Sequence, residues 1–288
     1  MKSFKIAAGF LMLAVCALAV PAQKLKADEI IAKHLDSIGT AAIRAAVKNQ
    51  IVVGDVQVSF VTPKSLPGQG RVVMASEGGK NFFGLNLNLN DYPFEKFSYD
   101  GKKVKVSFIR PGIHSLLGNL LASNELMLED SLFGGTLSSS WALLNTPETK
   151  AKLSADGTKK IDDRETYVIG YSPKGGGDFD IKMYFDKETF RHVRTEYKRV
   201  SSASIGRTST NTIGRSVDDS GRQLESRIKL VEDFSDFRAE KGVMLPHAYR
   251  LNYSISGQNG TTEVEWKFTL TEFGFNLKLD PKTFDIEM

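Results

Sequence analysis

The stretch from Glu263 to Leu270 reads Glu-Val-Glu-Trp-Lys-Phe-Thr-Leu, so an apolar side chain follows a polar one four times in succession. Side chains alternate between the two faces of a β-strand, and this stretch therefore predicts a strand with one buried and one wet face. Strands of this kind are typical of antiparallel sheets.

The same period of two recurs along most of the chain. The further alternating stretches are Val52–Phe60, Leu85–Leu89, Val104–Phe108, Phe179–Phe185 and Tyr249–Ile255. Turn signals lie between them at Tyr99–Lys102, Pro173–Asp178 and Asp186–Thr189. Together these patterns predict about ten or eleven antiparallel strands.

A helical pattern precedes the strands. Ile31, Leu35 and Ile38 are spaced by four and three residues and form one apolar stripe. We expect Asp28 to cap this helix and Gly39 to end it. Thr40 then predicts the cap of a second, shorter helix that runs to Val47.

Two segments interrupt the strands. Pro111–Thr149 shows helical spacing instead of alternation, with Leu137, Trp141 and Leu144 at i, i+4 and i+7, and predicts two or three short helices. Ser201–Arg222 is rich in Ser, Thr, Gly and Arg and predicts a flexible loop.

One apolar face of such a sheet must be covered. A closed barrel or a second sheet would cover it, and so would helices laid across the concave side of a curved sheet. We favour the last arrangement, because the helical segments are themselves apolar on one side. The predicted fold is a mainly β, curved, unclosed antiparallel half barrel whose concave face is covered by helices.

The first 22 residues predict a secretory signal peptide. Lys2 and Lys5 precede an apolar block of about 15 residues, shorter than the ~20 of a membrane helix, and Pro21-Ala22 suits cleavage after Ala22. We expect residues 23–288 to form a single exported, periplasmic domain without a transmembrane segment. The only cysteine, Cys16, lies in the leader, so the mature chain would lack thiol chemistry.

The charge balance gives no indication of a nucleic-acid partner. Of the 38 basic residues, two lie in the leader, so the mature chain would have 36 basic and 34 acidic residues and a net charge close to zero. Metal-ligand spacings are missing from the sequence, and we expect no metal or other cofactor.

Candidates for catalysis are weak. Gly135-Thr-Leu-Ser138-Ser lacks the second glycine of a nucleophile elbow. Acidic clusters occur at Asp162-Asp163 and at Glu232-Asp233 with Asp236, and we interpret them as solvated turn acids. The glycine runs at 78–79 and 175–177 lack the frame of a phosphate-binding loop. The sequence therefore predicts a protein without enzymatic activity.

The order of several motifs resembles that of exported bacterial proteins of the outer-membrane lipoprotein-sorting (LolA/LolB-like) superfamily. The motifs are the helix Ala27–Gly39, the strand Ile51–Val56, Tyr99–Lys102, Asp163–Tyr167, Tyr184–Phe190, Asp233–Arg238 leading to Gly242 and Leu245-Pro246, and Leu279–Phe284. The resemblance covers nearly the whole mature chain. It implies an unclosed half barrel of roughly eleven strands and a periplasmic function in binding or carrying a lipid, an acylated lipoprotein or another apolar ligand.

Within that architecture we expect an acyl chain between the sheet and the segment Pro111–Thr149, which would act as a lid. Burying ~10 methylenes would contribute roughly 8 kcal/mol of gross transfer free energy. The expected lid-side residues are Leu116, Leu120, Leu132, Phe133, Leu137, Trp141 and Leu144, and the expected floor residues are Leu87, Phe108, Trp266 and Phe268.

Two other functions stay open. The second hypothesis is an envelope scaffold that holds a protein partner without any ligand. The third is a hydrolase whose active site cannot be recognised in the sequence. A dry, packed core beneath the lid is the structural alternative to a ligand cavity.

Overall fold

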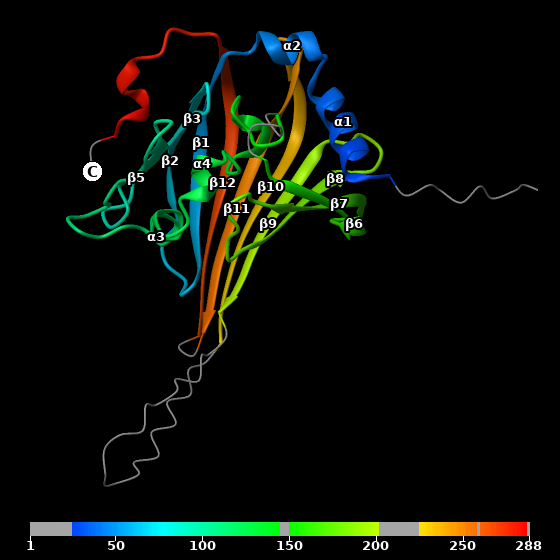
Figure 1. The fold of residues 1–288 in the computed structure, drawn as a ribbon. Helices are drawn as coiled ribbons and strands as arrows, with labels where there is room; N and C mark the ends of the chain where they lie inside the picture. The colour runs from blue at the N-terminus through cyan, green and yellow to red at the C-terminus, as the bar shows by residue number, and fades with distance from the viewer. Residues whose placement is uncertain (1–24, 145–149, 202–224, 258–259, 287–288) are drawn as a thin grey trace, which may run out of the picture.

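A single antiparallel sheet of twelve strands forms the body of the protein in the computed structural model, which describes residues 25–144, 150–201, 225–257 and 260–286 (Figure 1). The predicted signal peptide and nearly all of the predicted loop Ser201–Arg222 lie outside the described residues. The strands are β1 Asn49–Thr62, β2 Gly68–Glu77, β3 Lys80–Leu87, β4 Phe94–Tyr99, β5 Val104–Val106, β6 Lys152–Ile161, β7 Arg164–Ser172, β8 Asp180–Asp186, β9 His192–Ser201, β10 Ser226–Glu240, β11 Val243–Gly257 and β12 Gly260–Phe275.

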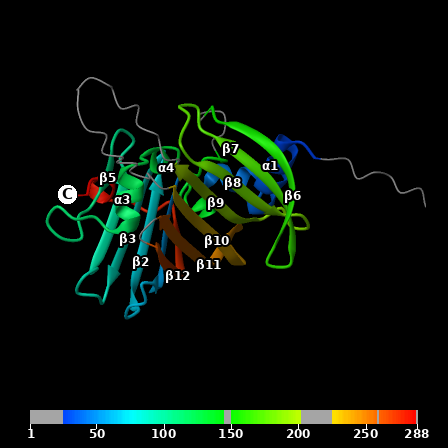
Figure 2. The same cartoon turned by 90° about the horizontal axis from the view of Figure 1, so that it is seen from below.

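The sheet is curved and unclosed. Its strand order is β5-β4-β3-β2-β1-β12-β11-β10-β9-β8-β7-β6, so β5 and β6 form its two edges although they follow one another in the sequence. Seen from below, the sheet bends around α1, α3 and α4 (Figure 2). The chain between β5 and β6 must therefore cross from one edge to the other, which places it over the concave face.

The register confirms the alternation predicted from the sequence. On β12, Phe268 pairs with Val56 of β1 on one side and with Tyr249 of β11 on the other. Trp266 of the same strand pairs with Val58 of β1. All five side chains are buried. The predicted half barrel is thus present, with twelve strands instead of ten or eleven. One reason for the difference is β6, a mostly exposed edge strand without apolar alternation.

Two helices begin the described chain: α1 (Ala27–Ile38) and α2 (Ala41–Ala46). Thr40 caps α2 as predicted, because its Oγ1 accepts a hydrogen bond from the backbone N–H of Ile43 at 3.3 Å. The predicted cap at Asp28 is wrong. The N-cap is Lys26, two residues earlier, and α1 begins at Ala27, because the Glu29 carboxylate accepts a hydrogen bond from the Lys26 N–H and completes the first turn there.

Residues 111–144, here called the covering segment, contain α3 (Leu116–Ala122), α4 (Leu126–Glu129) and the short 3-10 helix η1 (Gly135–Leu137). Short helices were predicted, but residues 138–144 are not helical. Ser138 Oγ accepts a hydrogen bond from the Ser140 N–H at 3.1 Å, a local contact that competes with helix formation. A second 3-10 helix, η2 (Pro281–Phe284), lies near the end of the chain. None of the described helices has the length and apolar character needed to cross a membrane.

Candidate functional site

The apolar core lies between the concave face of the sheet and the covering segment. Of the residues predicted for the lid side, Leu120, Leu132, Phe133, Leu137 and Trp141 are buried in this core. Leu144 is partly buried and packs against the same cluster, whereas Leu116 is 37% exposed. The structure therefore brings six of the seven together against the sheet and turns Leu116 outward.

The predicted floor residues are divided in a similar way. Leu87, Trp266 and Phe268 belong to the core cluster. Phe108 does not, because it follows the short strand β5 and stacks on His114 with ring centroids 4.3 Å apart. The spacing that groups it with Val104 and Val106 extends past the end of the strand at Val106.

Aromatic rings form the centre of this core. Phe133 meets Phe83 and Phe97 edge-on, each with centroids 5.4 Å apart. On the sheet, Tyr249 stacks against Phe268 at 4.9 Å and against Phe234 at 5.1 Å. Contacts of this geometry add to the stabilisation from buried area.

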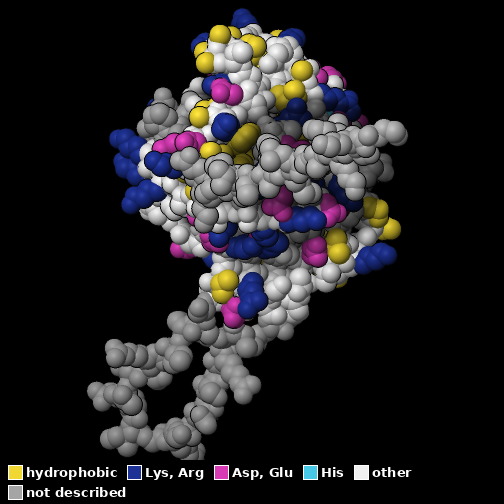
Figure 3. Space-filling view, turned by 90° about the vertical axis from the view of Figure 1, so that its right-hand side faces the viewer, with side chains coloured by type: hydrophobic (Ala, Val, Ile, Leu, Met, Phe, Trp, Pro, Cys, Tyr) yellow, Lys and Arg dark blue, Asp and Glu magenta, His cyan; other side chains and the backbone are white. Residues whose placement is uncertain are grey.

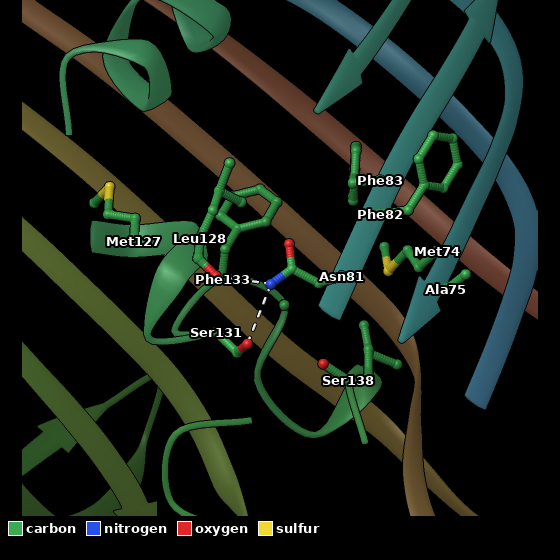
Figure 4. A pocket seen from close by; sticks show the side chains of 12 residues that line it. Met74, Ala75, Asn81, Phe82, Phe83, Met127, Leu128, Ser131, Phe133 and Ser138 are labelled. Atoms are coloured by element: carbon green, nitrogen blue, oxygen red, sulfur yellow. Dashed lines mark hydrogen bonds between the residues drawn. The ribbon is translucent and has the colours of Figure 1, made fainter. Parts of the chain in front are cut away.

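Polar side chains of the sheet hold the main chain of the covering segment. Gln50 of β1 donates to the Leu137 carbonyl at 3.0 Å. Asn81 of β3 donates to the Leu128 carbonyl at 2.7 Å and to the Ser131 hydroxyl at 3.1 Å (Figure 4). Hydrogen bonds of buried groups are costly to leave unmade, so these contacts fix the position of the cover.

A serine pair makes a further connection between cover and sheet. The Oγ atoms of Ser76 on β2 and Ser139 on the covering segment lie 2.9 Å apart, and the Ser139 N–H donates to Ser76 Oγ at 2.8 Å. Ser138, the serine of the incomplete nucleophile-elbow pattern, is buried, and its Oγ accepts a hydrogen bond from the backbone N–H of Ser140.

A fully buried carboxylate, Glu232 of β10, lies beneath the glycine pair of the cover. Its Oε1 accepts hydrogen bonds from the Gly134 N–H and the Tyr249 hydroxyl, both at 2.7 Å, and its Oε2 accepts one from the Tyr197 hydroxyl at 2.8 Å. Burial raises the pKa of this carboxyl to about 7, and the three donated hydrogen bonds oppose that rise.

The position of Glu232 corrects the interpretation of the acidic cluster. Glu232 and Asp233 lie in the middle of a strand, so their side chains point to opposite faces instead of sharing a solvated turn. Asp233, on the outer face, accepts hydrogen bonds from Arg194 at 2.5 Å and from Arg250 at 2.7 Å. The sequence did contain a signal for this placement, which the interpretation missed: Glu232 alternates with the apolar residues Leu230 and Phe234, and all three are buried.

A second buried carboxylate, Glu95 of β4, lies beneath α3. It accepts hydrogen bonds from the hydroxyls of Tyr92 and Ser115. Burial raises its pKa to about 7, against the effect of these hydrogen bonds and of the Gly118 backbone. Both carboxylates therefore lie on the sheet and face the covering segment.

Two buried histidines surround Trp141. The His192 ring stacks on the indole at 4.9 Å, and the His34 ring meets it edge-on at 5.2 Å. Burial lowers the pKa of His34 to about 4, although its Nδ1 hydrogen-bonds to the Phe190 carbonyl at 2.8 Å. Burial also lowers the pKa of His192, and His34 adds to this effect. Both imidazoles are therefore neutral near pH 7.

The space left between cover and sheet is small. One cavity of about 30 Å³ lies among Met74, Phe83, Met127, Phe133 and Ser138 (Figure 4). Another of about 30 Å³ lies between Arg44, Gln50 and Leu144. Ligand sites for small molecules usually have ≈ 300–1,000 Å³, so neither of these two cavities has room for an acyl chain.

Two larger hollows are present besides these cavities, and charged residues such as Asp162, Asp233 and Glu165 contribute to their lining. They have about 430 and 460 Å³ and share Arg164 and Val193. On the side of the molecule that carries α1 and β6, basic and acidic side chains are interspersed (Figure 3). In the described parts of the chain, no group of three or more His, Cys, Asp or Glu side chains is placed to hold a metal ion.

No family model and no curated protein matches the chain. Among solved structures, it is similar to a LolA superfamily protein from Nitrosomonas europaea, with 14% identity and a TM-score of 0.47 over 91% of this chain and 98% of the other.

Two further structures show a similar extent of overlap. A putative outer-membrane lipoprotein-sorting protein domain from Vibrio parahaemolyticus is 13% identical, with a TM-score of 0.43 over 88% of this chain and 97% of the other. A DUF1329 family protein from Desulfovibrio piger is 11% identical, with a TM-score of 0.40 over 90% and 96%. The chain itself forms an unclosed antiparallel sheet with helices on its concave side.

Proposed function

We propose that the protein is a non-catalytic, exported binding protein that holds an apolar chain between the concave face of the sheet and the covering segment. The ligand would be a lipid, an acylated protein or another apolar molecule in the periplasm. The observation that carries this proposal concerns the covering segment. Its apolar side chains fill the concavity, while a small number of hydrogen bonds from β1, β2 and β3 hold its main chain to the sheet.

In the closed state, Leu132, Phe133, Leu137 and Trp141 occupy the concavity in place of a ligand. The cavities of about 30 Å³ mean that the ligand enters only when these side chains leave. The three helices of the cover have seven, four and three residues, and helices this short depend on packing for their stability. Displacement of the cover is therefore the required step of binding.

A ligand chain compensates for the apolar contacts that the cover gives up. Each methylene buried contributes about 0.8 kcal/mol, so ~10 methylenes contribute roughly 8 kcal/mol before ordering costs. The covering segment, residues 111–144, would then form a lid within a single domain; the predicted lid also included residues 145–149, which lie outside the described residues.

A cross-link tests this proposal. The Oγ atoms of Ser76 and Ser139 lie 2.9 Å apart, so cysteine sulfurs at these two positions would lie next to each other. The variant Ser76→Cys/Ser139→Cys, made with Cys16→Ala, would lock the cover to β2 when oxidised. We expect the reduced variant and the unmodified protein to take up the uncharged fluorescent probe N-phenyl-1-naphthylamine, and the oxidised variant to take up at least tenfold less.

The single variants Ser76→Cys and Ser139→Cys, treated with the same oxidant, are the matched controls. Uptake by the oxidised double variant at the level of its reduced form would show that the cover does not need to move. If neither native mass spectrometry nor fluorescence detects any bound chain in the unmodified protein, the binding function is wrong. The second candidate, an envelope scaffold with a filled core, would then be preferred, and the small cavities favour it.

A further inference from the structure

Glu232 lacks a positive partner, unlike the neighbouring carboxylates of the sheet. On the outer face, Asp233 is paired with Arg194 and Arg250, and Glu196 is paired with Lys198. Among the residues that the structure describes, no Lys, Arg or His nitrogen lies within 4 Å of the Glu232 oxygens. Three neutral donors satisfy this fully buried carboxylate, and none of them balances its charge.

One of these three donors belongs to the cover, and two belong to the sheet. When the cover leaves, Tyr197 and Tyr249 stay in place on β9 and β11, while Oε1 loses the hydrogen bond from the Gly134 N–H. The vacated position on Oε1 calls for a new donor. A ligand carboxylate or phosphate offers only acceptors there and is repelled by the charge.

The surroundings of Glu232 also suit an apolar chain that carries such a donor. The rings of Phe234, Tyr249 and Phe268 form a stack on the same face of the sheet, with successive centroids 5.1 and 4.9 Å apart. The Tyr249 hydroxyl, at the edge of this stack, donates its hydrogen bond to Glu232 Oε1. A donor on Oε1 would therefore lie beside an apolar surface, and an ammonium group there would be attracted by the charge of the carboxylate.

We propose that Glu232 binds the polar end of the ligand, and that this end is a primary ammonium group attached to an apolar chain. The inference rests on the proposed function, because the site becomes accessible only when the cover moves. It adds the chemical class of the ligand. The ammonium replaces the Gly134 N–H on Oε1, the two tyrosine hydroxyls retain their hydrogen bonds, and the apolar chain replaces the side chains of the cover.

Decylamine, decanol and decanoate provide the test, because they share one apolar chain and differ in the polar end. Each would displace the fluorescent probe N-phenyl-1-naphthylamine from the full-length exported protein at pH 8, below the concentrations at which micelles form. Both decylamine and decanol can donate a hydrogen bond to Glu232, but only the ammonium balances the charge of the carboxylate, so we expect decylamine to bind at least about tenfold more tightly than decanol, a difference of about 1.4 kcal/mol. Decanoate should bind most weakly.

The variant Glu232→Gln preserves the shape of the side chain and removes its charge. We expect it to bind decylamine and decanol within about a factor of two of each other. Asp233→Asn is the matched control, since it removes one negative charge from the next residue on the opposite face and should keep the preference for the amine. The comparison of the three ligands on the unmodified protein is decisive by itself if Glu232→Gln does not fold.

The outcomes separate the two proposals. Equal affinity for decylamine and decanol, or an unchanged preference in Glu232→Gln, would overturn the ammonium site and leave the binding function standing. Displacement by none of the three compounds would overturn both. Lysophosphatidylethanolamine and lysophosphatidylglycerol distinguish the source of the ammonium. If the protein prefers lysophosphatidylethanolamine and loses this preference in Glu232→Gln, the ammonium belongs to a lipid headgroup. If it prefers decylamine to decanol but does not distinguish the two lipids, the ligand is a free amine.

Discussion

Replacing Glu232 by glutamine should change how the stability of the protein depends on pH. In the folded protein, burial raises the pKa of this carboxyl from 4.5 to about 7. The folded state therefore holds the proton more tightly than the unfolded state. The resulting stabilisation is fully present below pH 4.5 and is lost as the pH rises through 7.

The magnitude follows from the size of this shift. One pKa unit corresponds to 1.36 kcal/mol, so ionisation of Glu232 costs the folded state about 3 kcal/mol at pH 8 relative to pH 4. Glutamine does not ionise. The difference in unfolding free energy between Glu232→Gln and the unmodified protein should therefore move by about 3 kcal/mol in favour of the variant between these pH values.

Urea unfolding followed by tryptophan fluorescence measures this difference, because Trp141 and Trp266 are both buried. The histidines of the core titrate in the same range, but their contribution is common to both proteins and cancels in the comparison. Glu95→Gln should show the same trend, since burial raises the pKa of Glu95 to about 7 as well. A difference that stays constant from pH 4 to pH 8 would refute the description of Glu232 as a desolvated carboxylate.

Three further predictions concern the cover and the histidines. His34, with a pKa lowered to about 4, stabilises the fold above pH 6.5 and loses this contribution as the pH falls toward 4. Between pH 6.5 and pH 4, the free energy of unfolding of His34→Gln should therefore fall by about 3 kcal/mol less than that of the unmodified protein, as measured by urea unfolding. Gly135→Ala should destabilise more than Gly134→Ala in thermal unfolding, because the new Cβ would meet the Phe234 ring at 2.9 Å at the first position and nothing within 4 Å at the second; equal losses would contradict this packing. Trp141→Ala should cost about 3–5 kcal/mol in urea unfolding, as expected for a fully buried aromatic residue, and a loss below 1 kcal/mol would show that the core can collapse around the gap.

Much of the sheet follows from local patterns. The alternation in Glu263–Leu270 became β12, and the same pattern identified β1, β3, β8 and β11. Period-two alternation is a local property of extended backbone with one buried face, so it survives in a single sequence. The edge strand β6 escaped this reasoning, because its residues are largely exposed on both faces.

The candidate site could be predicted only in part. Helical spacing grouped Leu137, Trp141 and Leu144 correctly as residues that face the sheet, although residues 138–144 form no helix. The same reasoning assigned Phe108 to the floor and Leu116 to the lid, where the structure has a ring stacked on His114 and a half-exposed side chain. The spacing of apolar residues indicates which side chains share a face of a helix or strand. It does not indicate where that helix or strand ends, and Phe108 lies beyond the end of β5 at Val106.

The sequence by itself determined the class of the fold, a one-sided antiparallel sheet with an apolar cover, because hydrophobic alternation depends on neighbours in the chain. The tertiary structure alone decided that β5 and β6 become opposite edges and that the segment between them crosses the concavity. It also decided that Glu232 lies beneath Gly134, 98 positions away in the chain. Local alternation with Leu230 and Phe234 assigns Glu232 to the inner face of the sheet, but the segment that covers it there, and hence the rise of its pKa, comes from a distant part of the chain that no local pattern records.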